Sequence, residues 1–371
     1  MGYEVGTGSI GEELLEATAR LVAIPSVSRG GGALADLVEA ELRGRRHLEV
    51  VRVGDNVLAR SRRSRPVRLA LAGHLDTVPP AGNALPRRDG EVLHGVGTAD
   101  MKGGLAVLLA LAAIEDTACD CTFVLYAREE VDRPESGLLE LQAAVPELLT
   151  AHAAVLLEPT SSRVEAGCQG VVKARVSLRG RRAHVARPWT GVNAVHRLGP
   201  LLAQVADFGD RRPVVEGCEY RESLQAVQVT GGVAANVVPD EASLLVVYRF
   251  APDKDEATAR ATLQAQLAPA MGSDDRIEIL DLAPAAAPGL SHRALEALVA
   301  ASGRPPVAKL AWTDVAFFAE RGVPAANFGP GDPLLAHTPE ERIGRVELEA
   351  AYRALSQLVT VPLPPTPCEG R

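Results

Sequence analysis

Mostly apolar runs alternate along the first part of the chain with stretches of helical spacing. Residues 67–72, 122–127 and 153–157 are almost wholly apolar, which is typical of strands buried on both faces of a parallel sheet. Residues 12–22 have the spacing of an amphipathic helix, and residues 101–114 are so apolar that their helix must lie inside the core. This part of the chain therefore predicts an α/β unit with a mixed, mostly parallel sheet flanked by helices.

The pattern changes after residue 171. Apolar and polar residues alternate over the next predicted strand, which indicates an antiparallel sheet with one face on a core. The resulting order β-α-β-β-α-β is that of a ferredoxin-like α+β unit. The predicted elements are strand 172–178, helix 192–206, strands 223–230 and 242–250, helix 256–267 and strand 276–282.

The chain returns to α/β character after residue 283, with predicted helices at 292–301 and 346–359. The ferredoxin-like unit is therefore predicted to be an insertion in the larger unit. We expect a catalytic domain formed by residues 1–171 and 284–371, and a lid or dimerisation domain formed by residues 172–283.

Composition narrows the class of protein. The chain has 371 residues, 47% of them hydrophobic, and a formal net charge of −8, which argues against a nucleic-acid partner. Five cysteines without a C-x-x-C pair indicate reduced, buried thiols in the cytosol. We see no signal peptide and no membrane-spanning run, and so expect a cytoplasmic protein with no membrane partner. The Pro-rich tail at 362–367 is expected to be disordered.

Polar side chains with ligand chemistry follow each of the three apolar strands. His74 and Asp76 follow the first, Glu129 and Glu130 the second, and Glu158 the third. Because the carboxyl ends of parallel strands meet at the edge where open α/β sheets bind ligands, these side chains should converge. Surface carboxylates occur anywhere, but three coinciding strand ends are hard to assign to chance.

Two further candidates complete a metal site. Asp100 lies in a glycine-rich turn, and His337 lies in a polar loop near the end of the chain. Taken singly, such residues have ordinary explanations, since Asp100 suits a helix N-cap and His74 a loop histidine. Taken together, two histidines and three carboxylates exceed what one tetrahedral zinc ion takes. They suit two metal ions a few Å apart, bridged by one carboxylate.

Two acidic residues beside the ligands are given separate roles. Asp76 follows His74 by two residues and is expected to accept the second ring N–H of that histidine, which fixes its tautomer. Glu129 is next to a ligand but is not needed as one. It is therefore a candidate general base that takes a proton from the attacking water and returns it to a leaving amine.

In combination, these motifs resemble the M20 family of dinuclear zinc amidohydrolases and peptidases. They are His-Leu-Asp-Thr-Val-Pro from residue 74, Gly-x-Gly-x-x-Asp-Met-Lys-Gly-Gly from residue 95, the Glu-Glu pair, Leu-Glu-Pro-Thr and the late histidine. The resemblance covers nearly the whole chain. It implies two Zn²⁺ per chain, with Co²⁺ or Mn²⁺ as substitutes, one held by His74 and Glu158, the other by Glu130 and His337, with Asp100 as bridge, Glu129 as base and Asp76 as orienting acid.

Within the family, residues 165–170, 182–196 and 311–332 contain stretches most similar to the succinyl-diaminopimelate desuccinylases of actinobacterial type. That resemblance implies hydrolysis of N-succinyl-LL-2,6-diaminopimelate to succinate and LL-2,6-diaminopimelate, for lysine and diaminopimelate synthesis. It also implies a homodimer formed through the inserted domain. His184 would then reach the partner subunit's active site and stabilise the oxyanion, and Asn236 and Arg249 would bind substrate carboxylates.

Other interpretations stay open on the sequence alone. His184 lies among arginines and suits a solvated basic loop, and Arg249 suits an edge charge. A related deacylase, such as an acetylornithine deacetylase, or a dipeptidase or carboxypeptidase would share the whole metal site. A non-catalytic binding homologue should have lost Glu129 or a ligand, and none is missing.

Overall fold

The structure is a computed structural model that describes residues 9–363, so most of the Pro-rich tail lies outside the described residues. The chain divides into two compact units. Within the described residues, the first contains 9–166, Pro288–Val307 and 317–363; the second contains Gly167–Ala287 and Ala308–Ala316. The second unit is thus an insertion with a short additional segment.

The first unit is built on an eight-stranded sheet with the strand order β1-β2-β6-β3-β7-β18-β8-β17. Its central neighbours β6, β3, β7 and β18 run parallel, whereas β1, β2 and β8 are antiparallel to their partners. The predicted mixed α/β fold is therefore confirmed. The strands are β1 (Leu48–Val53), β2 (Asn56–Ser61), β3 (Arg68–His74), β6 (Asp120–Tyr126), β7 (Ala153–Leu156), β8 (Glu165–Ala166), β17 (Val307–Ala308) and β18 (Ala325–Asn327).

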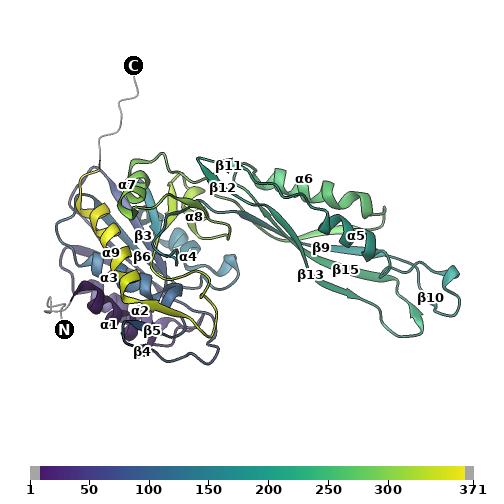
Figure 1. Cartoon of the computed structure of the whole chain (residues 1–371), viewed down its shortest axis with the longest axis horizontal. Coiled ribbons are helices and arrows are strands. Elements are labelled where there is room, and N and C mark those ends of the chain that lie inside the picture. The colour runs from purple at the N-terminus through teal and green to yellow at the C-terminus, as the bar shows by residue number, and fades with distance from the viewer. Residues whose placement is uncertain (1–8, 364–371) are drawn as a thin grey trace, which may run out of the picture. The chain divides into compact units, whose positions relative to one another are not determined.

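The apolar runs explain why these strands lie inside the unit. Every residue of β6 and β7 is buried, as is every residue of β3 after Arg68. Helix α3 is also buried along its whole length, and it packs against α1 and α9, as Figure 1 shows. The helices of this unit are α1 (Ile10–Val22), α2 (Gly32–Arg43), α3 (Gly103–Ala112), α4 (Gly137–Ala144), α7 (Arg293–Ser302) and α9 (Arg345–Thr360), and α8 (Val315–Ala319) begins in the second unit and ends in the first.

The glycine-rich turn before α3 is longer than the sequence predicts. Helix α3 begins at Gly103 because Asp100 and Met101 have non-helical backbone angles inside the wide turn η1 (Thr98–Lys102). The sequence pattern also misses α4 and a small three-stranded sheet, whose elements are too short to show a clear period. That sheet has the order β19-β5-β4, with β4 (Arg87–Asp89), β5 (Val92–His94) and β19 (Arg342–Gly344).

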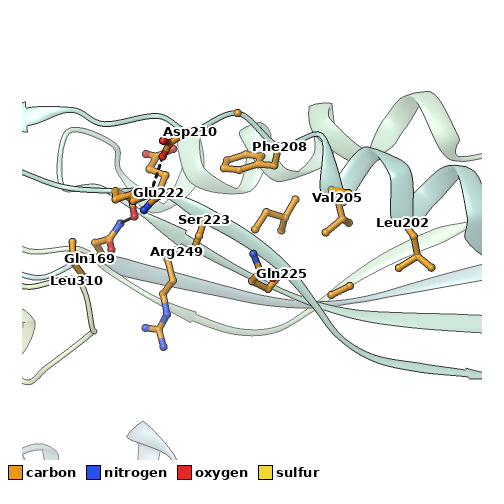
Figure 2. A pocket seen from close by; sticks show the side chains of 15 residues that line it. Gln169, Leu202, Val205, Phe208, Asp210, Glu222, Ser223, Gln225, Arg249 and Leu310 are labelled. Atoms are coloured by element: carbon orange, nitrogen blue, oxygen red, sulfur yellow. Dashed lines mark hydrogen bonds and ion pairs between the residues drawn. The ribbon is translucent and has the colours of Figure 1, made fainter. Parts of the chain in front are cut away.

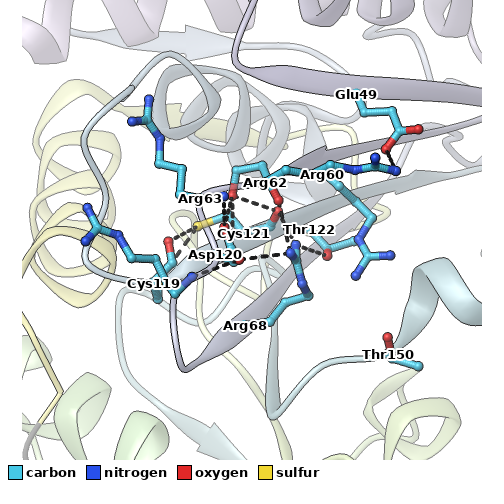
Figure 3. A network of polar contacts seen from close by, with 12 residues as sticks. Glu49, Arg60, Arg62, Arg63, Arg68, Cys119, Asp120, Cys121, Thr122 and Thr150 are labelled. Atoms are coloured by element: carbon cyan, nitrogen blue, oxygen red, sulfur yellow. Dashed lines mark hydrogen bonds and ion pairs between the residues drawn. The ribbon is translucent and has the colours of Figure 1, made fainter.

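Asp120, at the start of β6, is the centre of a network of polar contacts (Figure 3). It lies beside Arg68, at the end of β3 and β6 opposite to the end that carries His74. Its carboxylate accepts hydrogen bonds from the Ser61 hydroxyl and from the backbone N–H groups of Arg63 and Arg65, and pairs with Arg68 at 3.1 Å. A buried carboxylate needs such partners. The described cysteines beside it and elsewhere are free and buried, as predicted; they are Cys119, Cys121, Cys168 and Cys218.

The second unit contains a four-stranded antiparallel sheet with the order β13-β15-β9-β16. Alternate residues of β15 share a buried cluster with α5 and α6, so both helices cover one face. Helix α5 begins at Leu198 rather than near residue 192, because the Asn193 side chain accepts two backbone N–H groups and forms a turn. The elements are β9 (Gly170–Arg179), α5 (Leu198–Ala206), β13 (Ser223–Gly231), β15 (Glu241–Phe250), α6 (Glu256–Leu267) and β16 (Arg276–Ala283), with the short pairs β10 (Ala183–His184) and β14 (Val237–Val238), and β11 (Val214–Val215) and β12 (Cys218–Glu219).

Candidate active site

The carboxyl ends of three parallel strands bring the predicted ligands of the first unit together. In the parallel register His74, the last residue of β3, lies beside Tyr126, the last residue of β6. Strand β7 ends beside β3 as well, two residues before Glu158. The loops that follow these strands therefore start at one edge of the sheet, which is where this architecture places its ligands.

Asp100 lies between the two histidines. Its Oδ1 is 3.0 Å from Nε2 of His74, and its Oδ2 is 3.2 Å from Nε2 of His337. The same nitrogen of His337 is 2.7 Å from Oε1 of Glu130. One carboxylate with an oxygen directed at each histidine has the arrangement expected of a bridging ligand.

The ligand atoms form three overlapping groups, and within each group all atoms lie within 4.8 Å of one another. His74, Asp100 and Glu158 form one group, and Asp100, Glu130 and His337 form another. His74, Glu129 and Glu130 form the third. Imidazole nitrogens and carboxylate oxygens in sets of three fit zinc and related divalent ions. The donor set therefore fits two metal ions that share Asp100.

Asp76 contacts its neighbours differently from the sequence prediction. Nδ1 of His74 is 2.9 Å from the backbone oxygen of Asp76, while the Asp76 carboxylate lies 3.8 Å away. That carboxylate instead accepts the backbone N–H groups of Glu129 at 3.0 Å and Glu130 at 3.1 Å, and the hydroxyl of Ser28 at 2.6 Å. Asp76 thus fixes the histidine through its main chain and the Glu129–Glu130 segment through its side chain.

The charges of the site are mutually stabilised. Hydrogen bonds to Asp100 and Glu130 raise the pKa of His337 to about 10. Burial acts to lower the pKa of His74, but Asp100 and Glu158 outweigh it, so that pKa is raised well above the usual value. Burial acts to raise the pKa of Asp100, but the two histidines hold it well below its usual range. The carboxylates therefore favour the protonated form of both histidines, and a metal ion that bound there would have to displace those protons.

The predicted substrate residues lie in the second unit, at two ends of its sheet. His184 pairs with Val237 between β10 and β14, and the backbone oxygen of Asn236 accepts the N–H of Val185. Arg249 lies on β15 opposite Ser223, whereas β15 reaches the other end of β13 at Ala242. Seven residues of strand span about 23 Å. His184 and Asn236 are therefore far from Arg249 within one chain.

Arg249 borders a hollow of about 760 Å³ in the second unit (Figure 2). Its guanidinium points away from Asp210 and Glu222, and burial lowers its pKa. Within the described part of the chain this guanidinium has no hydrogen bond or ion pair, so its charge is available to an anionic ligand. By contrast, two arginines of the basic loop near His184 are engaged, Arg179 with Glu241 and Arg182 with Asp240.

Two side chains that support the site in the first unit give no signal in the sequence. Ser28 contacts Asp76, and Glu341, four residues after His337, accepts the backbone N–H groups of Ala99 and Asp100. A serine in a loop and a glutamate beside another glutamate are too common to single out. Only the fold shows what they contact.

Known proteins resemble this chain in sequence and in fold. Residues 70–361 match the model of peptidase family M20/M25/M40. A Mycobacterium tuberculosis protein, named provisionally as a succinyl-diaminopimelate desuccinylase, is 49% identical over 92% of this chain and 96% of its own. A succinyl-diaminopimelate desuccinylase of Corynebacterium glutamicum is 42% identical over 88% of this chain and 90% of its own. An aminopeptidase structure from Bacillus cereus superposes with a TM-score of 0.76 at 20% identity, covering 94% of this chain and 98% of that one.

The family match and the relatives named as desuccinylases identify a metal-dependent amidohydrolase. The chain belongs to peptidase family M20/M25/M40. Within the described residues, no helix is both long and apolar enough to cross a membrane.

Proposed function

We propose that this chain hydrolyses N-succinyl-LL-2,6-diaminopimelate to succinate and LL-2,6-diaminopimelate. The observation that carries the proposal is the complete ligand set with Glu129 beside it, in a chain 49% identical over most of its length to a protein with that name. No ligand or base expected of such an enzyme is replaced.

The five ligands are assigned to two zinc ions. His74 and Glu158 would hold one ion, Glu130 and His337 the other, and Asp100 both. When bound, the ions polarise the amide carbonyl and activate the attacking water. The protein holds the ligands ready, since Asp100 already lies within 3.2 Å of both histidines.

Glu129 is assigned as the general base. Its carboxylate would accept a proton from the attacking water and return that proton to the nitrogen of the leaving amine. The Asp76 carboxylate holds the backbone of Glu129 and of the neighbouring ligand Glu130, so one side chain aligns base and ligand. We assign Asp76 this orienting role.

Substrate recognition is assigned to the second unit. The proposed substrate carries three carboxylates and one ammonium group, and a planar guanidinium binds a carboxylate through two parallel hydrogen bonds. Arg249 has a guanidinium without a hydrogen-bond partner in the described residues and is assigned to one carboxylate. Asn236 and His184 lie together at the other end of that sheet, so we assign them to the active site of a second subunit.

This assignment requires a dimer, and the edge of the sheet in the second unit is a candidate surface for the dimer interface. Strand β13 is an edge of its sheet, and it exposes Val227 and Val229 by 53% and 50%. Unpaired edges that carry apolar side chains are ready to pair with another chain. We propose a two-fold homodimer formed through this unit, with the His184 side chain stabilising the oxyanion in the partner's site.

The test of the function is a comparison of kcat/KM, with zinc present, for N-succinyl-LL-diaminopimelate, N-acetylornithine and simple N-acyl amino acids. A clear preference for the succinyl substrate is expected. A preference for either competitor would make the chain a related deacylase with the same metal chemistry. Arg249→Lys keeps the charge but loses the planar fork, and should lower kcat/KM sharply for the succinyl substrate.

A further inference from the structure

Glu341 is a buried carboxylate that the proposed reaction does not use. It is 1% exposed and lies between the His337 loop and strand β19. Its Oε1 accepts the backbone N–H groups of Ala99 and Asp100, each at 3.0 Å. One oxygen atom of Glu341 therefore holds the main chain at the residue that lies between both histidines.

The turn that presents Asp100 depends on this contact. Asp100 and Met101 have non-helical backbone angles, so the backbone at Asp100 is not held by a regular helix. Buried backbone N–H groups require acceptors, and the Glu341 side chain supplies one for two of them. The Glu341 carboxylate therefore accepts N–H groups that backbone carbonyls would accept in a regular helix.

The same residue joins the two segments that carry ligands. The backbone oxygen of Glu341 accepts the N–H of Gly95, where the chain leaves β5 toward Asp100. The next residue, Arg342, pairs with His94 between β19 and β5. The His337 loop and the Asp100 turn are thus attached to each other by main chain and side chain, four residues from His337.

We propose that Glu341 is a positioning residue of the metal site, which sets Asp100 and His337 at the separation that a shared metal ion requires. The inference rests on the proposed metal site, but on no particular substrate. It assigns the effect to the length of the side chain, because a carboxylate and an amide oxygen both accept two N–H groups, whereas a shorter side chain cannot reach them.

The test uses the apo protein and measures the affinity of each zinc ion by chelator competition, for Glu341→Asp, Glu341→Gln and Glu341→Ala. Partners that orient metal ligands typically contribute about 10- to 100-fold in metal affinity. We expect the Asp and Ala variants to lose affinity in that range, most strongly for the ion held by Asp100, Glu130 and His337. The Gln variant should bind both ions nearly as the wild type does.

The neighbouring Glu340 provides a matched control, since it is exposed and its side chain has no hydrogen bond or ion pair in the described residues. Glu340→Ala should bind both ions normally. The absorption spectrum of the Co²⁺-loaded protein should change in Glu341→Asp and not in Glu341→Gln, which a general loss of stability would not produce. If Glu341→Ala fails to fold, the Asp and Gln variants still decide the question.

Three results would overturn the inference. Wild-type affinity in Glu341→Asp would show that the position of Asp100 does not depend on this side chain. A loss in the Gln variant as large as that in the Asp variant would show that the reach of the side chain does not explain the effect. Absence of metal binding by the wild-type protein would refute the proposed metal site itself. A different preferred substrate, by contrast, would refute the proposed function and leave the role of Glu341 intact.

Discussion

The carboxylate of Asp76 binds the main chain of Glu129: Oδ1 of Asp76 accepts the backbone N–H of Glu129 at 3.0 Å. The other oxygen accepts the N–H of Glu130 at 3.1 Å. Two adjacent glutamates with different assigned roles are therefore aligned by one buried side chain. This arrangement makes the separation of base and ligand testable.

Replacing each glutamate by glutamine should give different defects. Glu129→Gln should lower kcat by about 10²- to 10⁴-fold, the usual contribution of a general base, while both metal ions remain bound. Glu130→Gln should weaken metal binding, because Glu130 forms a ligand group with Asp100 and His337 and its Oε1 lies 2.7 Å from Nε2 of His337, whereas Glu129 is in neither group that contains Asp100. Turnover and metal content measured on the same samples separate the two. Equal behaviour of the two variants would show that the roles are wrongly assigned.

Metal binding should release protons. The pKa of His337 is raised to about 10 by Asp100 and Glu130, and that of His74 is also raised, so the metal-free site favours the protonated form of both imidazoles. A proton competes with the metal at every pH below the pKa of its group. Apparent metal affinity should therefore fall as pH falls, by about tenfold per pH unit for each proton released.

Calorimetric titration of apo protein with zinc, in two buffers of different ionisation enthalpy, counts these protons. Release of one to two protons per chain near pH 7 is expected. Absence of proton release would show that the histidines are neutral before metal arrives, or that they are not ligands.

The assignment of His184 to the partner subunit predicts complementation. His184→Ala chains and Glu129→Gln chains should each be nearly inactive alone. In a mixed dimer, one site has an intact Glu129 and receives an intact His184 from the other chain, whereas the second site lacks both. The mixed dimer should therefore recover up to half of the activity of the wild-type dimer. The hybrid must be isolated with two affinity tags. A purified hybrid without recovered activity would contradict action across the interface.

The sequence predicts most of the fold and nearly all of the candidate metal site for one physical reason. Apolar strands such as residues 67–72 and 153–157 can be recognised from the sequence alone, and the carboxyl ends of parallel strands lie at one edge of the sheet. The positions of His74 and Glu158 in the sequence therefore suffice to assign them to one site. His337 follows no such strand, so its residue type and the family resemblance are what assign it to the same site.

What the sequence does not provide are the contacts that depend on the exact course of the main chain. The spacing of His74 and Asp76 predicts a hydrogen bond between the Asp76 carboxylate and the imidazole ring. The carboxylate instead accepts the backbone N–H of Glu129, and the ring contacts the backbone oxygen of Asp76. Glu341 acts on a turn more than 240 residues earlier in the chain. The local sequence around Glu341 cannot predict that its side chain accepts backbone N–H groups from so distant a segment.

The most direct test of the account is the number of metal ions per chain. Elemental analysis of protein saturated with zinc and freed of excess should give two ions per chain, because the structure offers two groups of three ligand atoms that share Asp100. His337→Ala should retain one ion, since the group with His74, Asp100 and Glu158 is untouched. One ion or none in the saturated wild-type protein would contradict the dinuclear site on which the proposed chemistry depends.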